Sequence, residues 1–192
     1  MRVSKEEAAA TRARIVRTAG RLFRRKGFDG TGIDDVMTAA GLTHGGFYRH
    51  FPSKDALIAE ACASVLQRTG EEWAKAGQAA AGSPLDALVD RYLTAEHRDA
   101  PDLGCIFAAL GGDAGRKGDA ALTRRFAEGL EPLIDALAAA GPEPSDAERR
   151  QAAVARLATL VGALVLARAT AGTPASDEIL RAARAQLLPG TD

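Results

Sequence analysis

The 192-residue sequence predicts an all-helical protein, on three observations. No segment alternates apolar and polar residues as a half-buried β-strand does, apolar residues recur at helical spacing, and Ala, Leu, Arg and Glu dominate. Hydrophobic residues make up 46 % of the chain, which is enough to bury a core. The two cysteines are far apart, so neither a disulfide framework nor a zinc cluster is expected.

Three short helices and one long helix are expected in the first third of the chain. Gly27 and Gly41 follow the first two as turn residues, and Thr43 and Ser53 are N-cap residues for the third and the fourth. The expected helices cover residues 5–26, a short segment after Thr31, residues 44–50, and a long segment from residue 54. Residues 1–55 should therefore form one compact unit, and residues 56–192 a second helical unit.

Capping residues mark the helices that we expect in the second unit. Ser83-Pro84 suits a helix start, Gly141-Pro142 suits a helix end, and residues 145–148 form a capping box. Ser176 is expected to cap the last helix. The expected helices span residues 84–93, 103–114, 119–140, 146–170 and 177–187. The loose segments should be residues 75–82 and 171–175.

Charge is balanced overall but not along the chain. The formal net charge is zero, yet residues 1–60 carry four more basic than acidic side chains and the rest carries four more acidic ones. The balance excludes a uniformly basic coat protein, and the asymmetry favours a polyanion at the N-terminal end. The charged N-terminus lacks a signal-peptide stretch, and the apolar run Ala152–Ala167 is short for a membrane span. A cytoplasmic protein without a membrane partner is expected.

Residues 30–54 have the proportions of a helix-turn-helix motif. In that motif the second helix enters the major groove of DNA, and its first residues meet base edges. Phe47 and Phe51 are four residues apart and should face the core. The residues expected to face solvent are Thr43, His44, Gly45, Tyr48, Arg49 and His50. From the residues alone, a groove-binding helix and a poor helix in an ordinary core both remain open.

Two neighbouring segments of the chain resemble the DNA-binding signature of TetR/AcrR-type transcriptional regulators. They are TRARIVRTAGRLFRRKGFDGTGIDDVM and AAGLTHGGFYRHFPSKDAL. The resemblance covers about residues 11–60, and its most specific positions are Tyr48, Phe51, Lys54 and Leu57. It implies an N-terminal three-helix DNA-binding domain, joined by a long helix to a helical ligand-binding and dimerisation domain. The implied function is a ligand-responsive regulator, most simply a repressor, that binds a palindromic double-stranded operator as a homodimer and is released by a small-molecule inducer.

The resemblance also implies which residues read bases and sugars. Thr43, His44 and Gly45 are expected at base edges. Tyr48 and His50 are expected at backbone phosphates or sugars. Because His44 and His50 lie on different faces of a short helix, no metal site is expected, and no cofactor is implied.

Phosphate contacts are expected at both ends of the motif. The resemblance implies that Thr31 and Lys54 contact phosphate, and a helix N-terminus assists Lys54. Arg49 either reaches phosphate or faces solvent. Gly32 stands where the family often has a hydroxyl residue, which removes one possible phosphate contact.

The resemblance further implies a homodimer and an internal ligand pocket. The dimer surface is expected on the last two long helices, residues 146–170 and 177–187, although burial of their apolar faces within one chain is the alternative. Candidate pocket residues, each of which could also be plain core, are Trp73, Tyr92, His97, Cys105, Phe107 and Phe126. Cys105 near a helix start is either a reactive sensor or a small buried hydrophobe, and Cys62 is expected to pack.

Two other classes of function remain as alternatives. A helical enzyme has little support, because no Ser-His-Asp set, Gly-rich phosphate loop or metal cluster is present in the sequence. A helix-turn-helix retained as a protein-interaction module is the other alternative.

Overall fold

The computed structural model describes residues 5–78 and 82–188, and these residues form helices and no strand. The all-α fold predicted from the sequence is thus confirmed. The elements are α1 (Lys5–Lys26), α2 (Ile33–Ala39), the 3₁₀ helix η1 (His44–Arg49), α3 (Lys54–Gln78), α4 (Pro84–Tyr92), α5 (Ala95–Asp99), α6 (Ile106–Lys117), α7 (Ala120–Ala140), α8 (Asp146–Ala169) and α9 (Pro174–Leu187).

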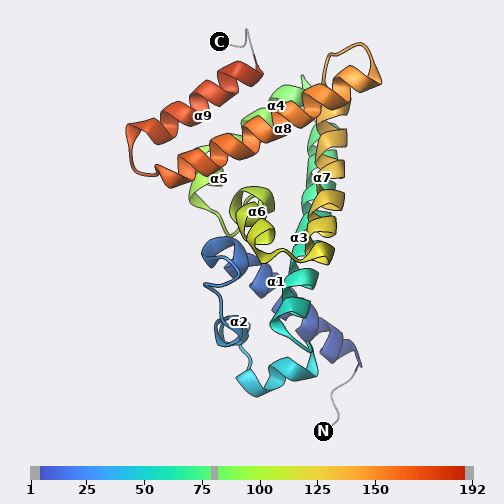
Figure 1. Cartoon of the computed structure of the whole chain (residues 1–192), viewed down its shortest axis with the longest axis vertical. Helices are drawn as coiled ribbons and strands as arrows, with labels where there is room; N and C mark the ends of the chain where they lie inside the picture. The colour runs from blue at the N-terminus through green and yellow to red at the C-terminus, as the bar shows by residue number, and fades with distance from the viewer. Residues whose placement is uncertain (1–4, 79–81, 189–192) are drawn as a thin grey trace.

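The molecule is elongated, with α1, α2 and η1 at one end and α8 and α9 at the other (Figure 1). Helices α3 and α7 pack against each other between these ends. Their close approach depends on glycine: a Cβ on Gly129 would lie 2.5 Å from Leu66 Cδ2, and one on Gly70 would lie 2.9 Å from Pro132 Cβ. The pair connects the two ends of the molecule.

Several predicted helix boundaries are confirmed because local capping determines them. The Ser83 hydroxyl accepts a hydrogen bond from the Asp86 amide at 3.3 Å, and Pro84 follows in the first turn of α4. Ser145 and Glu148 form the expected capping box at the start of α8. The first helix has the predicted bounds.

Three boundary predictions are wrong. Helix α9 begins at Pro174, two residues before Ser176, which is fully buried and donates a hydrogen bond to the Ala167 carbonyl at 2.7 Å. The segment expected to be loose at residues 75–82 is helical to Gln78, and its residues 79–81 lie outside the described residues. The helix expected at residues 103–114 is α6, which begins later, at Ile106, and ends at Lys117, and the short helix α5 before it was not expected.

The core consists of two apolar clusters, one near each end. The first contains the fully buried Phe23, Phe47 and Phe51 of the N-terminal end, and it also contains Ile106 and Leu110 of α6. The second is built mainly from α4, α7 and α8. The first cluster crosses the boundary expected at residue 55, so the N-terminal helices share their core with α6.

Helix α8 is apolar for much of its length. It has 24 residues, and an 18-residue window of mean hydropathy 1.7 would suffice by length and composition to cross a membrane. The sequence predicted an apolar run that is short for a membrane span, but the whole helix is long enough for one. Core helices of soluble proteins pass the same test, and α8 packs against α6, α7 and α9.

Two adjacent aromatic residues allow a direct test of the first cluster. Phe47 is fully buried, so Phe47→Ala should lower the free energy of unfolding by about 3–5 kcal/mol. The control is Tyr48→Ala: Tyr48 is 63 % exposed, so its loss should cost no more than about 0.5 kcal/mol. Urea denaturation of both variants measures the difference, and equal costs would contradict the described packing.

Candidate functional site

Thr31 lies inside the protein, at the turn between α1 and α2. It is fully buried, and its hydroxyl donates to the Gly27 carbonyl at 2.8 Å. Gly27 has a φ of +76°, and the adjacent Phe28 amide donates to the Asp113 carboxylate at 2.9 Å. The expectation that Thr31 contacts phosphate is therefore corrected: its side chain fixes the turn and has no free surface.

The start of α2 is fixed by an acidic side chain. The Gly32 amide donates to the Asp35 carboxylate at 2.8 Å, and Lys26 lies 3.6 Å from the same carboxylate group. The amide and then the Lys26 charge hold the pKa of Asp35 below its usual range. Gly32 stands where the family often has a hydroxyl residue, but its amide is still hydrogen-bonded. Helix α2 therefore begins where the motif requires.

The segment expected to enter the major groove, residues 44–50, forms the 3₁₀ helix η1, where an α-helix was expected. Thr43 stands at its N-cap position, but its side chain makes no capping hydrogen bond, so its predicted capping role is wrong. The rings of Phe47 and Phe51 stack with their centroids 5.8 Å apart. Burial of these two rings, more than helix propensity, determines the position of η1.

Arg12 of α1 holds the end of η1. Its guanidinium lies 4.1 Å from the centroid of the Phe51 ring and donates to the carbonyl oxygen of His50. It also pairs with the Glu60 carboxylate of α3, with Nε 3.0 Å from Oε1. One side chain therefore joins α1, η1 and α3. The sequence did not indicate this role, because Arg12, Arg14 and Arg17 lie close together around Ile15 and nothing in the sequence distinguishes Arg12 from the other two.

The residues predicted to contact DNA, apart from Thr31, are brought together at this end. Thr43, His44, Gly45, Tyr48 and Arg49 are exposed, and His50 and Lys54 are half-buried. Lys54 is the first residue of α3, where the Ser53 hydroxyl accepts from the Ala56 amide at 3.1 Å.

His44 has a partner that the sequence did not indicate. Its Nδ1 pairs with the Asp34 carboxylate of α2, and its ring lies edge to face with that of Tyr48 at 6.4 Å. The pair orients the imidazole at the exposed surface. Among the described residues, no group of three His, Cys, Asp or Glu side chains has the geometry to hold a metal ion.

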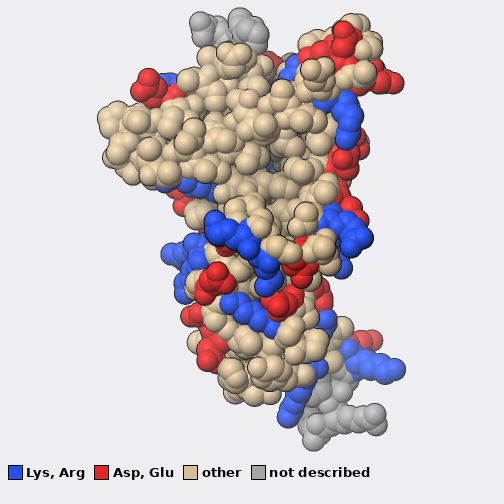
Figure 2. All heavy atoms as spheres, in the orientation of Figure 1, with Lys and Arg blue, Asp and Glu red and all other residues tan. Residues whose placement is uncertain are grey.

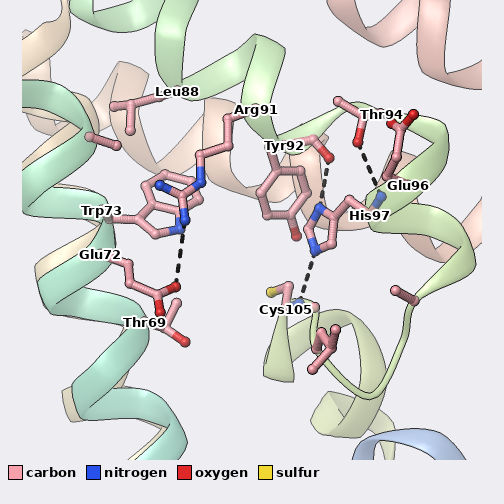
Figure 3. A pocket seen from close by; sticks show the side chains of 14 residues that line it. Thr69, Glu72, Trp73, Leu88, Arg91, Tyr92, Thr94, Glu96, His97 and Cys105 are labelled. Atoms are coloured by element: carbon pink, nitrogen blue, oxygen red, sulfur yellow. Dashed lines mark hydrogen bonds and ion pairs between the residues drawn. The ribbon is translucent and has the colours of Figure 1, made fainter. Parts of the chain in front are cut away.

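A cavity of about 380 Å³ lies in the C-terminal part of the molecule, between α3, α4, α5 and the start of α6 (Figure 3). Four of the predicted pocket residues line it: Trp73, Tyr92, His97 and Cys105. The other two, Phe107 and Phe126, are not among its lining residues. Phe126 belongs to the first apolar cluster and Phe107 packs against it, with the two rings edge to face at 5.6 Å, so both are core residues outside this cavity.

Both ring nitrogens of His97 form hydrogen bonds to backbone groups of residues that line the cavity. Its Nδ1 lies 2.7 Å from the Tyr92 carbonyl, to which it donates, and its Nε2 accepts from the Cys105 amide at 2.9 Å. This pattern requires the neutral ring, because Nε2 must accept. Burial, together with the charges of Arg168 and Arg91, lowers the pKa of His97.

The two cysteines are buried. Cys62 is 1 % exposed, and burial raises the pKa of its thiol to about 12, as expected for a packing residue. Cys105 is 6 % exposed, stands at the N-cap position of α6 and is one of the residues that line the cavity.

The loop between α5 and α6 contacts both the cavity and the N-terminal end. Leu103 and Gly104 line the cavity. The preceding residue, Asp102, contacts α1: its carbonyl accepts from Arg24 Nε at 2.9 Å, and its carboxylate pairs with Arg21 at 2.7 Å. The hydrogen bond from Arg21 lowers the pKa of Asp102, and burial lowers the pKa of Arg24 to about 10.

Known proteins resemble this chain in sequence and in structure. Residues 15–61 match the family described as bacterial regulatory proteins, tetR family. The chain is 32 % identical over 197 residues to the uncharacterised HTH-type transcriptional regulator Rv0196 of Mycobacterium tuberculosis, which covers 92 % of this chain and 94 % of the relative. It is 33 % identical over 89 residues to the uncharacterised HTH-type transcriptional regulator YerO of Bacillus subtilis, covering 46 % of this chain and 31 % of YerO.

The chain thus spans about a third of YerO's length but nearly all of the mycobacterial relative's. A crystal structure of reduced NemR from E. coli has the same fold, with a TM-score of 0.77 at 20 % identity, covering 93 % of this chain and 95 % of NemR. The chain belongs to the TetR family of helix-turn-helix transcriptional regulators. Its homologues are DNA-binding regulators and not enzymes.

The state of His97 predicts a pH dependence of stability. Because the folded protein lowers the pKa of His97, the unfolded chain binds more protons below the ordinary histidine value of about 6.5. The free energy of unfolding should therefore decrease as the pH falls from about 7.5 to about 5.5. His97→Gln should flatten this dependence and lower the stability at pH 7.5, because the Cys105 amide loses its acceptor.

Urea titrations at several pH values measure this effect. The matched control is His50→Gln, which removes a histidine outside the cavity and should keep the wild-type slope. If His97→Gln kept the full slope, the assignment of the neutral ring would be contradicted.

Proposed function

We propose that this protein is a ligand-responsive repressor that binds a palindromic operator as a homodimer and is released by a small-molecule inducer. The observation that carries the proposal is the exposed face of η1. Tyr48 is 63 % exposed beside polar neighbours, although the adjacent Phe47 is fully buried. A large exposed aromatic residue on a rigidly held element is typical of a binding surface.

The proposed roles follow the positions of the exposed residues. Thr43, His44 and Gly45 at the start of η1 would meet base edges in the major groove. Tyr48 and His50 would contact the sugar-phosphate backbone.

Two cations flank this surface. Lys54 at the first turn of α3 would bind a phosphate together with the helix N-terminus. Arg49 is exposed, which favours a phosphate contact for it as well.

The proposed dimer surface lies on α8 and α9, at the opposite end. An exposed stripe of small and apolar residues follows α8 at helical spacing: Val154, Ala158, Gly162, Val165, Leu166 and Ala169. The face formed by these two helices is broad and nearly free of charged side chains (Figure 2). Such a face suits an isologous four-helix contact, which would present two copies of η1 to successive major grooves.

The cavity is the proposed inducer site. It has the size and the aromatic lining of a small-molecule site. The loop that contains Asp102 would couple this site to α1. Arg24 of α1 is 4 % exposed and donates its hydrogen bonds to the Asp102 carbonyl of this loop. An inducer that prefers another loop position would shift α1 and with it the spacing of the two η1 elements. A regulator of this kind acts on DNA in the cytoplasm.

A pair of lysines on α3 tests the DNA-binding proposal. Lys54→Ala, alone or with Tyr48→Ala, should weaken binding to the intergenic DNA beside the gene by about tenfold or more, because charge-assisted phosphate contacts are lost. Lys75→Ala is the control, since it removes the same charge from the far end of the same helix.

Fluorescence anisotropy with labelled DNA at two salt concentrations measures these affinities. Lys54→Ala should also reduce the slope of log affinity against log salt by about one unit. Equal affinities for the wild type and for the Tyr48→Ala, Lys54→Ala double variant would contradict DNA binding through this surface.

A further inference from the structure

An acidic side chain lies beside the residues that are expected to meet base edges. Asp34 stands in the first turn of α2, and its side chain is 77 % exposed. Its neighbour Asp35 already binds the Gly32 amide and supplies the negative charge that suits a helix start. Asp34 instead contacts His44 of η1. A carboxylate at this surface repels phosphate, so its contact with His44 is the role that the structure gives it.

The contact between Asp34 and His44 fixes the direction of the imidazole ring. The Nδ1 atom of His44 bonds to the Asp34 carboxylate, and the ring lies edge to face with the Tyr48 ring at 6.4 Å. The side chain of His44 is nevertheless 55 % exposed. Two neighbours from two elements therefore hold a ring that still presents part of its edge to a partner.

The carboxylate also determines which ring nitrogen of His44 carries the hydrogen. An ionised carboxylate accepts hydrogen bonds and cannot donate one, so Nδ1 must be the donor. At pH 8 a histidine ring is ordinarily neutral, and a neutral ring with a hydrogen on Nδ1 has an acceptor at Nε2. Among the described residues, no donor is found for this Nε2 atom. His44 thus presents an unused acceptor at the surface of η1.

The residue after His44 leaves room for a close approach from outside. Gly45 is exposed, a Cβ on it would meet nothing within 4 Å, and its φ is not positive. Packing and backbone conformation within the described chain therefore do not require glycine at this position, although glycine weakens a helix relative to alanine. A glycine here does allow another surface to lie close to the backbone beside His44.

The major groove of DNA offers a limited set of donors to such an acceptor. Adenine presents its N6 amino group and cytosine its N4 amino group, whereas guanine and thymine present acceptors at the corresponding positions. Phosphate oxygens are acceptors as well. A histidine whose Nε2 accepts can therefore pair with the two amino bases, and it distinguishes them from the two keto bases.

We propose that Asp34 determines base specificity through His44: it holds Nδ1 as the donor, so that Nε2 accepts from the amino group of an adenine or a cytosine in each half-site. Asp34 is a positioning residue, because it acts on the base through His44. The inference rests on the proposed DNA-binding function and names the chemical group that His44 reads.

Selection from a randomised duplex library at pH 8 tests the proposal. The wild type should enrich sites with adenine or cytosine at one position of each half-site, and His44→Ala should lose this preference while other positions keep theirs. Fluorescence anisotropy then compares the selected duplex with one in which a keto base replaces that amino base. The replacement should weaken wild-type binding about fivefold and binding by His44→Ala less than about twofold.

Two isosteric variants separate the role of Asp34 from its charge. Asp34→Asn places an amide beside Nδ1, and an amide can accept or donate, so the discrimination should fall from about fivefold to about twofold or less. Its affinity for random DNA should not fall, because a negative charge is removed. Asp29→Asn is the matched control: it removes an exposed carboxylate from the turn before α2 and should keep the fivefold discrimination. Thermal unfolding checks that each variant retains the fold.

Three results would overturn this inference while DNA binding itself stands. They are a keto base at the position that His44→Ala affects, unchanged preferences in His44→Ala, and full discrimination in Asp34→Asn. A library from which the wild type enriches no sequence would instead overturn the proposed function, and this inference with it. The two failures are therefore distinguishable in the same experiment.

Discussion

The burial of Phe47 and Phe51 beneath Arg12 is the interaction on which the N-terminal end depends. The 3₁₀ helix η1 has only six residues, two of them glycines, and such a segment has no stability of its own. Two fully buried rings and a guanidinium that contacts Phe51, His50 and Glu60 fix it between α1 and α3. The exposed residues of η1 therefore have a defined position although their own backbone is weakly helical.

The second constraint is that the two ends of the molecule share a core. Ile106 and Leu110 of α6 pack in the same cluster as the aromatic rings of the N-terminal end. Arg24 and Asp113 add polar contacts across the same boundary. The α5–α6 loop lines the cavity on one side and binds α1 on the other, so a change at one end has a short physical path to the other.

The sequence predicted those features that depend on neighbours along the chain. The bounds of α1, the caps at Ser83 and Ser145 and the burial of Phe47 follow from spacing and capping, and all agree with the structure. The motif likewise identified the exposed face of η1, because its residues lie in one short segment.

Contacts between distant segments could not be predicted in this way. The role of Arg12, the burial of Thr31 and Ser176, and the absence of Phe126 from the cavity depend on which helices meet in space. The most direct test of the central claim, paired recognition of DNA by two copies of η1, is hydroxyl-radical footprinting on the intergenic DNA beside the gene. Two copies of η1 should give two symmetric protected stretches whose centres lie about 10 base pairs apart or a multiple of this. A single protected stretch, or uniform protection without symmetry, would contradict it.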